Sequence, residues 1–121
     1  MPSTVVWLDH RTAKIFKLVP KEMETESVDR VETQGSVRHK EEMTEKYYHQ
    51  LATRLNTATE VLLIGPGTAK QDFMHHLEKH HHQNVAKKVV GMETVDHPTE
   101  NQVLEKARKF FKKFDLYNTA Q

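Results

Sequence analysis

The sequence predicts one α/β domain over residues 1–121, in which helices cover both faces of a mixed sheet as a three-layer α-β-α sandwich. Three observations predict this fold. The first third of the chain is rich in strand-like runs, helical and strand-like segments alternate afterwards, and residues 61–64 form a short continuous apolar run. Such a run is typical of a central strand buried on both faces.

The first elements are strands. Residues 5–8 form a β-prone run, and residues 14–18 alternate polar with apolar side chains as a half-buried strand does. Residues 9–13 between them are expected to form a hairpin loop. Weaker alternation over residues 22–32 predicts a third, exposed strand.

The first helix follows a polar connection at residues 34–40 that contains Gly35. Its apolar residues recur at a spacing of four, which places them on one helical face: Met43, Tyr47, Leu51 and Leu55. We expect this helix to end near Asn56.

The buried run stops at a Gly-Pro-Gly turn, residues 65–67. Thr68 followed by Gln71 has the spacing of a capping box, so a helix is predicted from about residue 69 to 82. Its buried stripe is expected to consist of Ala69, Phe73 and Leu77.

Val89, Val90 and Val95 predict a further strand, interrupted at Gly91. Pro98 and the pair Thr99 and Gln102 then open the last helix. Five of its residues are expected to face the core: Val103, Ala107, Phe110, Phe111 and Phe114. The tail after about residue 115 is expected to fray.

Composition excludes several classes of protein. The chain has no cysteine, so disulfides, thiolate metal sites and cysteine nucleophiles are excluded. Neither a signal peptide nor an apolar run of membrane-spanning length occurs, so a soluble cytoplasmic protein is expected, with no membrane partner. A net charge of +1 disfavours binding to nucleic acid through bulk charge, and no DNA partner is expected.

The turn after the buried run is the first candidate contact surface. Glycine permits close backbone approach and proline stiffens the turn, so the N–H groups at the start of the helix can point toward a partner. The segment matches neither the phosphate-binding loop nor the dinucleotide fingerprint, so no cofactor is expected. A tight turn that only starts a helix is the alternative. The contact residues predicted here are Gly65, Pro66, Gly67, Thr68 and Lys70.

A histidine cluster is the second anomaly, comprising His75, His76, His80, His81 and His82. His76 and His80 are four residues apart and would share a helical face, as a pair of divalent-metal ligands does. No H-E-x-x-H arrangement accompanies them, and a catalytic zinc site is not expected. A solvated or core-edge helix face and an RNA contact are the alternatives.

The last helix is basic. It carries Lys106, Lys109 and Lys113, which are predicted to contact a partner or RNA, together with Arg108 and Lys112. A lysine-rich outer face is equally what an amphipathic helix needs to stay solvated, so both interpretations stay open.

No catalytic arrangement is apparent, and an enzyme is not expected. None of the serines lies in a nucleophile elbow: Ser3, Ser27 and Ser36. The neighbouring pairs Asp9 with His10 and Asp96 with His97 are expected at strand ends, where adjacent side chains point to opposite faces and form no dyad. Turn or capping roles are predicted for them.

Residues 61–73, VLLIGPGTAKQDF, resemble the strand, Gly-Pro-Gly turn and helix start of a known family. That family is the third domain of archaeal and eukaryotic class-1 peptide-chain release factors and of the rescue factor Pelota. Residues 5–16, VVWLDHRTAKIF, resemble the opening hairpin of related bacterial proteins. The match is best from Val61 to about Leu77.

The resemblance implies a fold similar to that of ribosomal and kink-turn RNA-binding proteins, used to dock a translational GTPase and the ribosome. No Gly-Gly-Gln tripeptide occurs, so peptidyl-tRNA hydrolysis is not expected. The predicted function is therefore a non-catalytic binding module for the ribosome, a translational GTPase or structured RNA. The alternatives are a histidine-rich divalent-metal-binding protein and an oligomerising structural domain.

Overall fold

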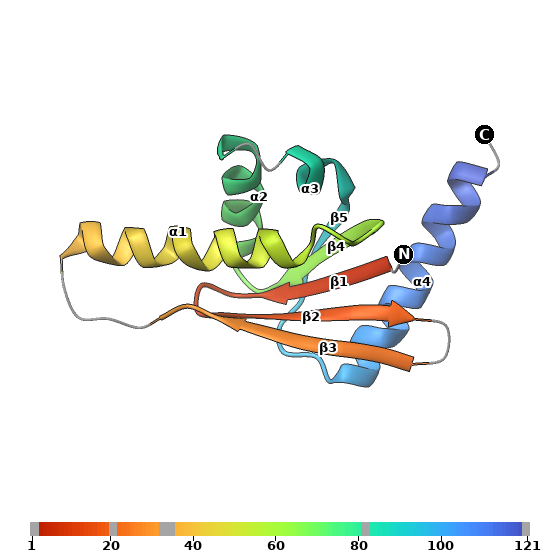
Figure 1. Cartoon of the computed structure of the whole chain (residues 1–121). Coiled ribbons are helices and arrows are strands. Elements are labelled where there is room, and N and C mark those ends of the chain that lie inside the picture. The colour runs from red at the N-terminus through yellow and green to blue at the C-terminus, as the bar shows by residue number, and fades with distance from the viewer. Residues whose placement is uncertain (1–2, 20–21, 32–35, 81–82, 120–121) are drawn as a thin grey trace.

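Five strands form one sheet in the order β3-β2-β1-β4-β5. The computed structural model describes residues 3–19, 22–31, 36–80 and 83–119 (Figure 1). Its strands are β1 (Ser3–Leu8), β2 (Thr12–Val19), β3 (Glu22–Asp29), β4 (Glu60–Gly65) and β5 (Val89–Thr94). Its helices are α1 (Val37–Arg54), α2 (Ala69–Lys79), α3 (Gln83–Lys88) and α4 (Glu100–Thr119).

The sheet is mixed, as predicted. Strands β1, β2 and β3 pair antiparallel through short connections, whereas β1 pairs with β4 and β4 with β5 in parallel. The parallel pairs need crossover connections, which the helices between them supply. All six residues of β4 are buried, in agreement with its continuous apolar sequence.

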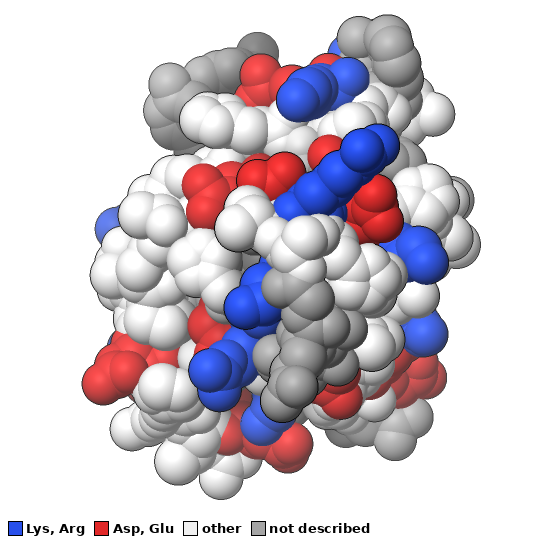
Figure 2. Space-filling view, turned by 90° about the vertical axis from the view of Figure 1, so that its left-hand side faces the viewer, with Lys and Arg blue, Asp and Glu red and all other residues white. Residues whose placement is uncertain are grey.

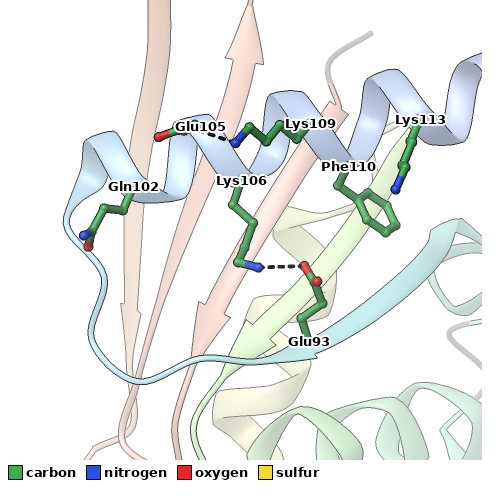
Figure 3. A pocket seen from close by; sticks show the side chains of 7 residues that line it. All are labelled: Glu93, Gln102, Glu105, Lys106, Lys109, Phe110 and Lys113. Atoms are coloured by element: carbon green, nitrogen blue, oxygen red, sulfur yellow. Dashed lines mark hydrogen bonds and ion pairs between the residues drawn. The ribbon is translucent and has the colours of Figure 1, made fainter.

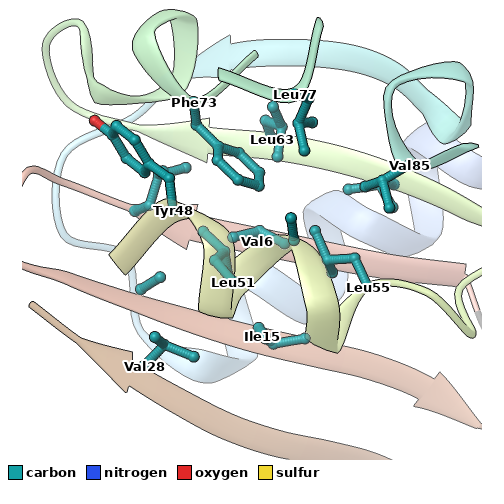
Figure 4. Close-up of a cluster of buried hydrophobic side chains, with 14 of the residues drawn as sticks. Val6, Ile15, Val28, Tyr48, Leu51, Leu55, Leu63, Phe73, Leu77 and Val85 are labelled. Atoms are coloured by element: carbon teal, nitrogen blue, oxygen red, sulfur yellow. The ribbon is translucent and has the colours of Figure 1, made fainter. Parts of the chain in front are cut away.

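The two faces of the sheet are covered by different helices, which confirms the three-layer sandwich (Figure 1). Alternate residues of β1 point to opposite faces. Val6 and Leu8 join the core under α1, α2 and α3, where Leu51 and Phe73 also lie (Figure 4). On the other face α4 packs on a second cluster: Val5, Trp7, Phe16, Leu62, Ile64, Val103, Ala107 and Phe111.

The β1–β2 hairpin turn is held by one carboxylate. The Asp9 side chain accepts hydrogen bonds from the backbone N–H groups of Arg11 and Thr12, both at 2.8 Å. The Tyr47 hydroxyl of α1 donates to the Asp9 carbonyl oxygen at 3.0 Å, and burial raises the pKa of that phenol. The hairpin is therefore tied to the helix that covers it, and the predicted turn role of Asp9 is confirmed.

Helix α1 begins earlier than its apolar periodicity suggests. Ser36 is its N-cap, and its hydroxyl accepts from the backbone N–H of His39 at 3.2 Å. The buried face is formed by Tyr47, Tyr48, Leu51 and Ala52, close to the predicted stripe. The helix ends at Arg54, two residues before the expected end.

The region between α2 and β5 differs from expectation. Helix α2 ends at Lys79, and the short helix α3, which packs Val85 into the core, was not predicted. Strand β5 is continuous from Val89 to Thr94, but its pairing with β4 shifts register between Val89 and Gly91, so the predicted interruption takes the form of a local irregularity in the pairing next to Gly91. A Cβ at Gly91 would lie 2.6 Å from the Phe110 ring, so glycine here makes room for α4 to approach the strand.

Helix α4 begins with the predicted capping box. The Thr99 N–H donates to Gln102 Oε1 at 2.9 Å, and the Gln102 N–H donates to Thr99 Oγ1 at 3.2 Å. The helix continues to Thr119, past residue 115, and fraying of this tail stays a prediction. The side chain of Phe114, expected in the core, lies outside the described residues.

Among the residues that the structure describes, no helix has the length and apolar character that crossing a membrane requires.

Glu26 links the acidic edge strand β3 to its neighbours. Its carboxylate is ion-paired with Arg54 at the end of α1 and with Lys17 of β2, the latter at 3.3 Å. The hydrogen bond from Arg54 holds the pKa of Glu26 below its ordinary value of 4.5. A carboxyl group whose pKa is lowered by folding stabilises the folded state at pH values above its unfolded-state pKa. This stabilisation is lost as the pH falls through the folded-state pKa.

We therefore expect Glu26→Gln to lower the free energy of unfolding at pH 7 by at most about 1 kcal/mol, because the pair is partly solvated. The difference from wild type should shrink as the pH falls below 4.5. Urea unfolding at a series of pH values measures it. A deficit that stays constant down to full protonation of the carboxyl would contradict the ion-pair explanation.

Candidate functional site

The Gly-Pro-Gly turn after β4 requires both of its glycines, for different reasons. Gly65 has φ +149°, and a Cβ there would lie 2.1 Å from the Leu8 carbonyl oxygen. Gly67 has φ +60°, a left-handed conformation, and has open space around it. The first glycine therefore allows β4 to pass close to β1, and the second only reverses the chain.

Thr68 precedes α2 but does not cap it with its side chain, so the predicted capping box with Gln71 is wrong. Its backbone, at φ −103° and ψ −1°, is already helical, whereas a capping side chain needs an extended backbone to reach the third N–H. The Thr68 carbonyl oxygen accepts from the Asp72 N–H at 2.9 Å. The Thr68 hydroxyl lies 3.5 Å from the Asp72 carboxylate.

Lys70 differs most from expectation, because it is not on the exposed surface of the turn. Its side chain is only 2% exposed, and its ammonium group donates to the Gly67 carbonyl oxygen at 2.7 Å. The lysine thus stabilises the turn from inside. The surface open to a partner is formed by the half-buried Pro66 and the exposed Gly67 and Thr68.

Two loops flank this turn. His10 of the β1–β2 hairpin contacts the Asp72 carboxylate of α2 at 3.0 Å. The N–H of Val95, after β5, donates to the Gly65 carbonyl oxygen at 3.2 Å. The turn therefore lies at the edge where the parallel strands end, the place where open α/β sheets commonly bind ligands.

The structure corrects the expectation that adjacent Asp and His side chains point apart. His97 Nδ1 lies 2.7 Å from Asp96 Oδ1, and the His97 ring centroid is 5.2 Å from that of Trp7. Strand β5 ends at Thr94, so the alternation of a strand does not apply to this pair. Both side chains are largely exposed, and the Asp96 carbonyl oxygen accepts from the Trp7 indole at 2.7 Å. Asp9 and His10 do diverge, toward the hairpin turn and α2.

The predicted basic residues of α4 border a groove of about 470 Å³ between that helix and β5 (Figure 3). Lys106 Nζ lies 3.3 Å from Glu93 Oε2, and Lys109 Nζ lies 3.1 Å from Glu105 Oε1. The groove is lined by Glu93, Gln102, Glu105, Lys106, Lys109, Phe110 and Lys113. We call it the α4 groove.

Helical spacing explains this arrangement. Lys106, Lys109 and Lys113 are separated by three and four residues, so they share one face of α4. Phe110 lies between them, half-buried against Gly91. The α4 groove therefore combines an aromatic side chain with lysine ammonium groups along its rim, which suits apolar groups flanked by carboxylates or phosphates.

The α4 groove starts close to the turn and runs away from it. Lys106 pairs with Glu93, which lies opposite Ile64, the residue before Gly65. Lys113 is seven residues further along α4, about 10 Å at 1.5 Å per residue. The Lys106 end of the α4 groove therefore lies beside the end of β4 that leads into the turn, and Lys70 is buried away from the surface.

Charges of both signs are mixed on the face shown in Figure 2, where Lys and Arg lie among Asp and Glu. This agrees with the formal net charge of +1. Local chemistry, rather than a broad field of one sign, must therefore select a partner.

The fold separates the buried His76 from the exposed His75 but keeps His76 and His80 together. His76 is buried at 8% exposure, whereas His75 beside it is exposed. His80 caps the end of α2 and is exposed, and its ring centroid lies 4.5 Å from that of His76. Among the described residues no three metal-binding side chains form a ready cluster. His81 and His82 lie outside the described residues.

Comparison of the fold with solved structures identifies its class. A Pelota structure from Archaeoglobus fulgidus matches with a TM-score of 0.68 at 16% identity, over 98% of this chain and 36% of that one. An archaeal translation termination factor, aRF1, matches with 0.65 at 16% identity, over 98% and 41%. Thermoplasma acidophilum Pelota matches with 0.63 at 22% identity, over 85% and 30%.

The chain therefore has a release-factor domain-3-like fold, as the resemblance of residues 61–73 implied. Its particular neighbours are Pelota, aRF1 and the yeast protein Dom34, a translation termination-like factor described as interacting with Hbs1. The chain spans 30% to 41% of the length of these proteins. A comparison with protein-family models and curated proteins found no match to the sequence.

The turn provides a stability test. Gly65→Ala is expected to lower the free energy of unfolding by about 3 kcal/mol or more, because the added Cβ would collide with the Leu8 carbonyl and the backbone conformation is strained. Gly67→Ala meets no neighbouring atom and should cost about 1 kcal/mol. Urea denaturation measures both variants. Equal losses would show that close strand approach does not explain Gly65.

Proposed function

We propose that this domain is a non-catalytic binding module associated with the translation machinery, and that the α4 groove with the adjoining Gly67–Thr68 turn is its contact surface. One observation carries the proposal: a release-factor domain-3-like fold presents an aromatic residue bordered by three lysines on an otherwise mixed-charge surface. The fold alone does not determine function, so the groove is the argument that concerns this chain.

The form of the α4 groove supports docking rather than catalysis. Its lysines border an open groove, and two of them are ion-paired with glutamates across solvent-accessible contacts. Catalytic groups work best in enclosed sites where water is excluded and polar groups are preorganised. A partly exposed aromatic side chain in an open groove, such as Phe110, is instead typical of recognition surfaces, in which aromatic residues are enriched.

A protein partner fits this surface better than bare RNA. The lining residues include two glutamates beside the three lysines, so the groove is only weakly positive. Phosphate-dominated binding needs several unopposed cations. An apolar side chain of a protein partner would pack on Phe110. Acidic residues beside it in the partner would replace Glu93 and Glu105 as the ion-pair partners of the lysines. We therefore infer that a translational GTPase or a ribosomal protein is the primary partner, with ribosomal RNA at the rim.

The first experiment is co-sedimentation of the untagged protein with ribosomes at several salt concentrations, alongside binding to a purified translational GTPase from the same cells. The wild-type protein should bind at least one of the two. Lys109→Glu with Lys113→Glu should weaken binding about tenfold or more, because both cations become anions beside the partner. If the lysines contact RNA phosphates, the slope of the log binding constant against log salt concentration should also become shallower by about one per lysine lost.

A matched variant controls for the change in net charge. Lys40→Glu with Lys79→Glu alters two exposed lysines of α1 and α2 that lie outside the α4 groove, and should leave binding close to wild type. Absence of the wild-type protein from every ribosomal fraction and from the GTPase would overturn the proposed function. Equal weakening by both double variants would overturn the assignment of the groove.

A further inference from the structure

Strand β5 forms one edge of the sheet, and this edge lies beside the α4 groove (Figure 3). Among the strands that the structure describes, β5 pairs with β4 alone. The groove is lined by Glu93 from β5 and by Phe110 from α4. The groove and the strand edge are therefore parts of one surface.

Two residues of β5 direct their backbone groups away from β4. The N–H of Val95, just after the strand, donates to the Gly65 carbonyl oxygen. Successive residues of a strand direct these groups to alternate sides, so those of Glu93 also point to β4, and those of Met92 and Thr94 point outward. Met92 and Thr94 are both exposed. The edge thus offers two N–H donors and two carbonyl acceptors to an incoming strand.

Apolar side chains flank this edge on both faces of the sheet. Phe110 lies on the α4 face, against Gly91. Met92 is in register with Leu63, which belongs to the core on the opposite face, so Met92 also lies on that face. Its side chain is 39% exposed. An added strand directs successive side chains to alternate faces, so one segment would cover both apolar residues.

The lysines of α4 form a row along this edge. Lys106 contacts Glu93, and one turn further along α4 the Phe110 ring lies against Gly91. The helix therefore runs beside β5 in the opposite direction (Figure 3). Lys106 and Lys113 are about 10 Å apart along the helix. Residues four apart on a strand are separated by about 13 Å, so two acidic residues at that spacing would reach both lysines.

The other edge of the sheet is protected against the same kind of partner. Strand β5 carries one acidic residue, Glu93, which is paired with Lys106. Half of the eight residues of β3 are acidic: Glu22, Glu24, Glu26 and Asp29. Charged side chains on an edge strand prevent unwanted pairing. An acidic segment is therefore repelled by β3 and attracted to the edge at β5.

We propose that an extended acidic segment of a protein partner adds to β5 as a sixth strand. Its backbone pairs with Met92 and Thr94. An apolar side chain packs on Phe110, and acidic side chains on either side of it pair with Lys106 and Lys113. In such strand addition the backbone hydrogen bonds supply affinity and the alternate side chains supply specificity. This inference rests on the proposed function, because it specifies how a partner occupies the α4 groove.

A second copy of this chain is a poorer occupant of the edge. Two β5 strands paired antiparallel about a two-fold axis would place both α4 helices on the same face of the joined sheet. The two rows of lysines would then face each other, and like charges brought together across an interface are unfavourable.

The test uses a blocked probe peptide, acetyl-Ser-Glu-Val-Leu-Val-Glu-Ser-amide, which places its leucine and both glutamates on one face of a strand. Binding to the full chain is followed by NMR titration, and backbone protection by hydrogen exchange. At saturating peptide, exchange of the Met92 and Thr94 amides should slow about tenfold or more, because both become hydrogen-bonded. The same peptide with lysines in place of the glutamates should bind about tenfold more weakly or worse.

Two variants at one exposed position separate backbone pairing from side-chain contact. Thr94→Pro removes an outward N–H and no hydrogen bond to β4, which an edge strand tolerates. It should weaken binding of the peptide about fivefold or more, because one backbone hydrogen bond is lost. Thr94→Ala keeps that N–H and should bind like wild type. Thermal midpoints of both variants check that they remain folded.

The outcomes distinguish this inference from the proposed function. Peptide binding without protection of Met92 and Thr94, and with equal affinity in both Thr94 variants, would overturn strand addition. Failure of the peptide to bind, while the chain still associates with ribosomes or the GTPase, would overturn the inference and leave the proposed function standing. Peptide binding with the expected protection, but without either association, would do the reverse. A dimer of the free chain that the peptide dissociates would overturn the acidic partner as the natural occupant.

Discussion

The burial of β4 is the constraint on which the rest of the structure depends. Every residue of this strand is buried, which requires a strand on each side and helices on both faces. Leu63 is covered by the layer of α1, α2 and α3, and Leu62 and Ile64 by α4. The parallel pairing with β1 brings together Ser3 and Glu60, which are 57 residues apart in the sequence. The Ser3 hydroxyl donates a hydrogen bond to Glu60 Oε1 at 2.7 Å.

Two glycines at the strands β4 and β5 allow neighbouring segments to pack closely against the sheet. Gly65 passes so near Leu8 that no side chain fits, and Gly91 accepts the ring of Phe110. Gly65 lets β4 pass close to β1, and Gly91 lets α4 approach β5. The position of the lysines along α4 therefore follows from the packing of the strands beneath them.

The two outer layers carry different chemistry. The α4 layer presents lysines around an aromatic residue, whereas the α1–α2 layer presents imidazoles and carboxylates. Because the sheet separates the layers, ligands on the two surfaces would not compete for the same atoms.

The sequence by itself determined the class of the fold, the central strand and the capping box of Thr99 and Gln102. It also determined that three lysines share one face of α4: Lys106, Lys109 and Lys113. These features depend on periodicity or on residues a few positions apart, which a sequence displays directly. Tertiary structure alone decided that Lys70 and His76 are buried. It also decided that the Thr68 side chain makes no cap hydrogen bond to α2, and that Glu45 faces His80. Each of these depends on which distant segment covers a helical face, and periodicity identifies a face without identifying what packs on it.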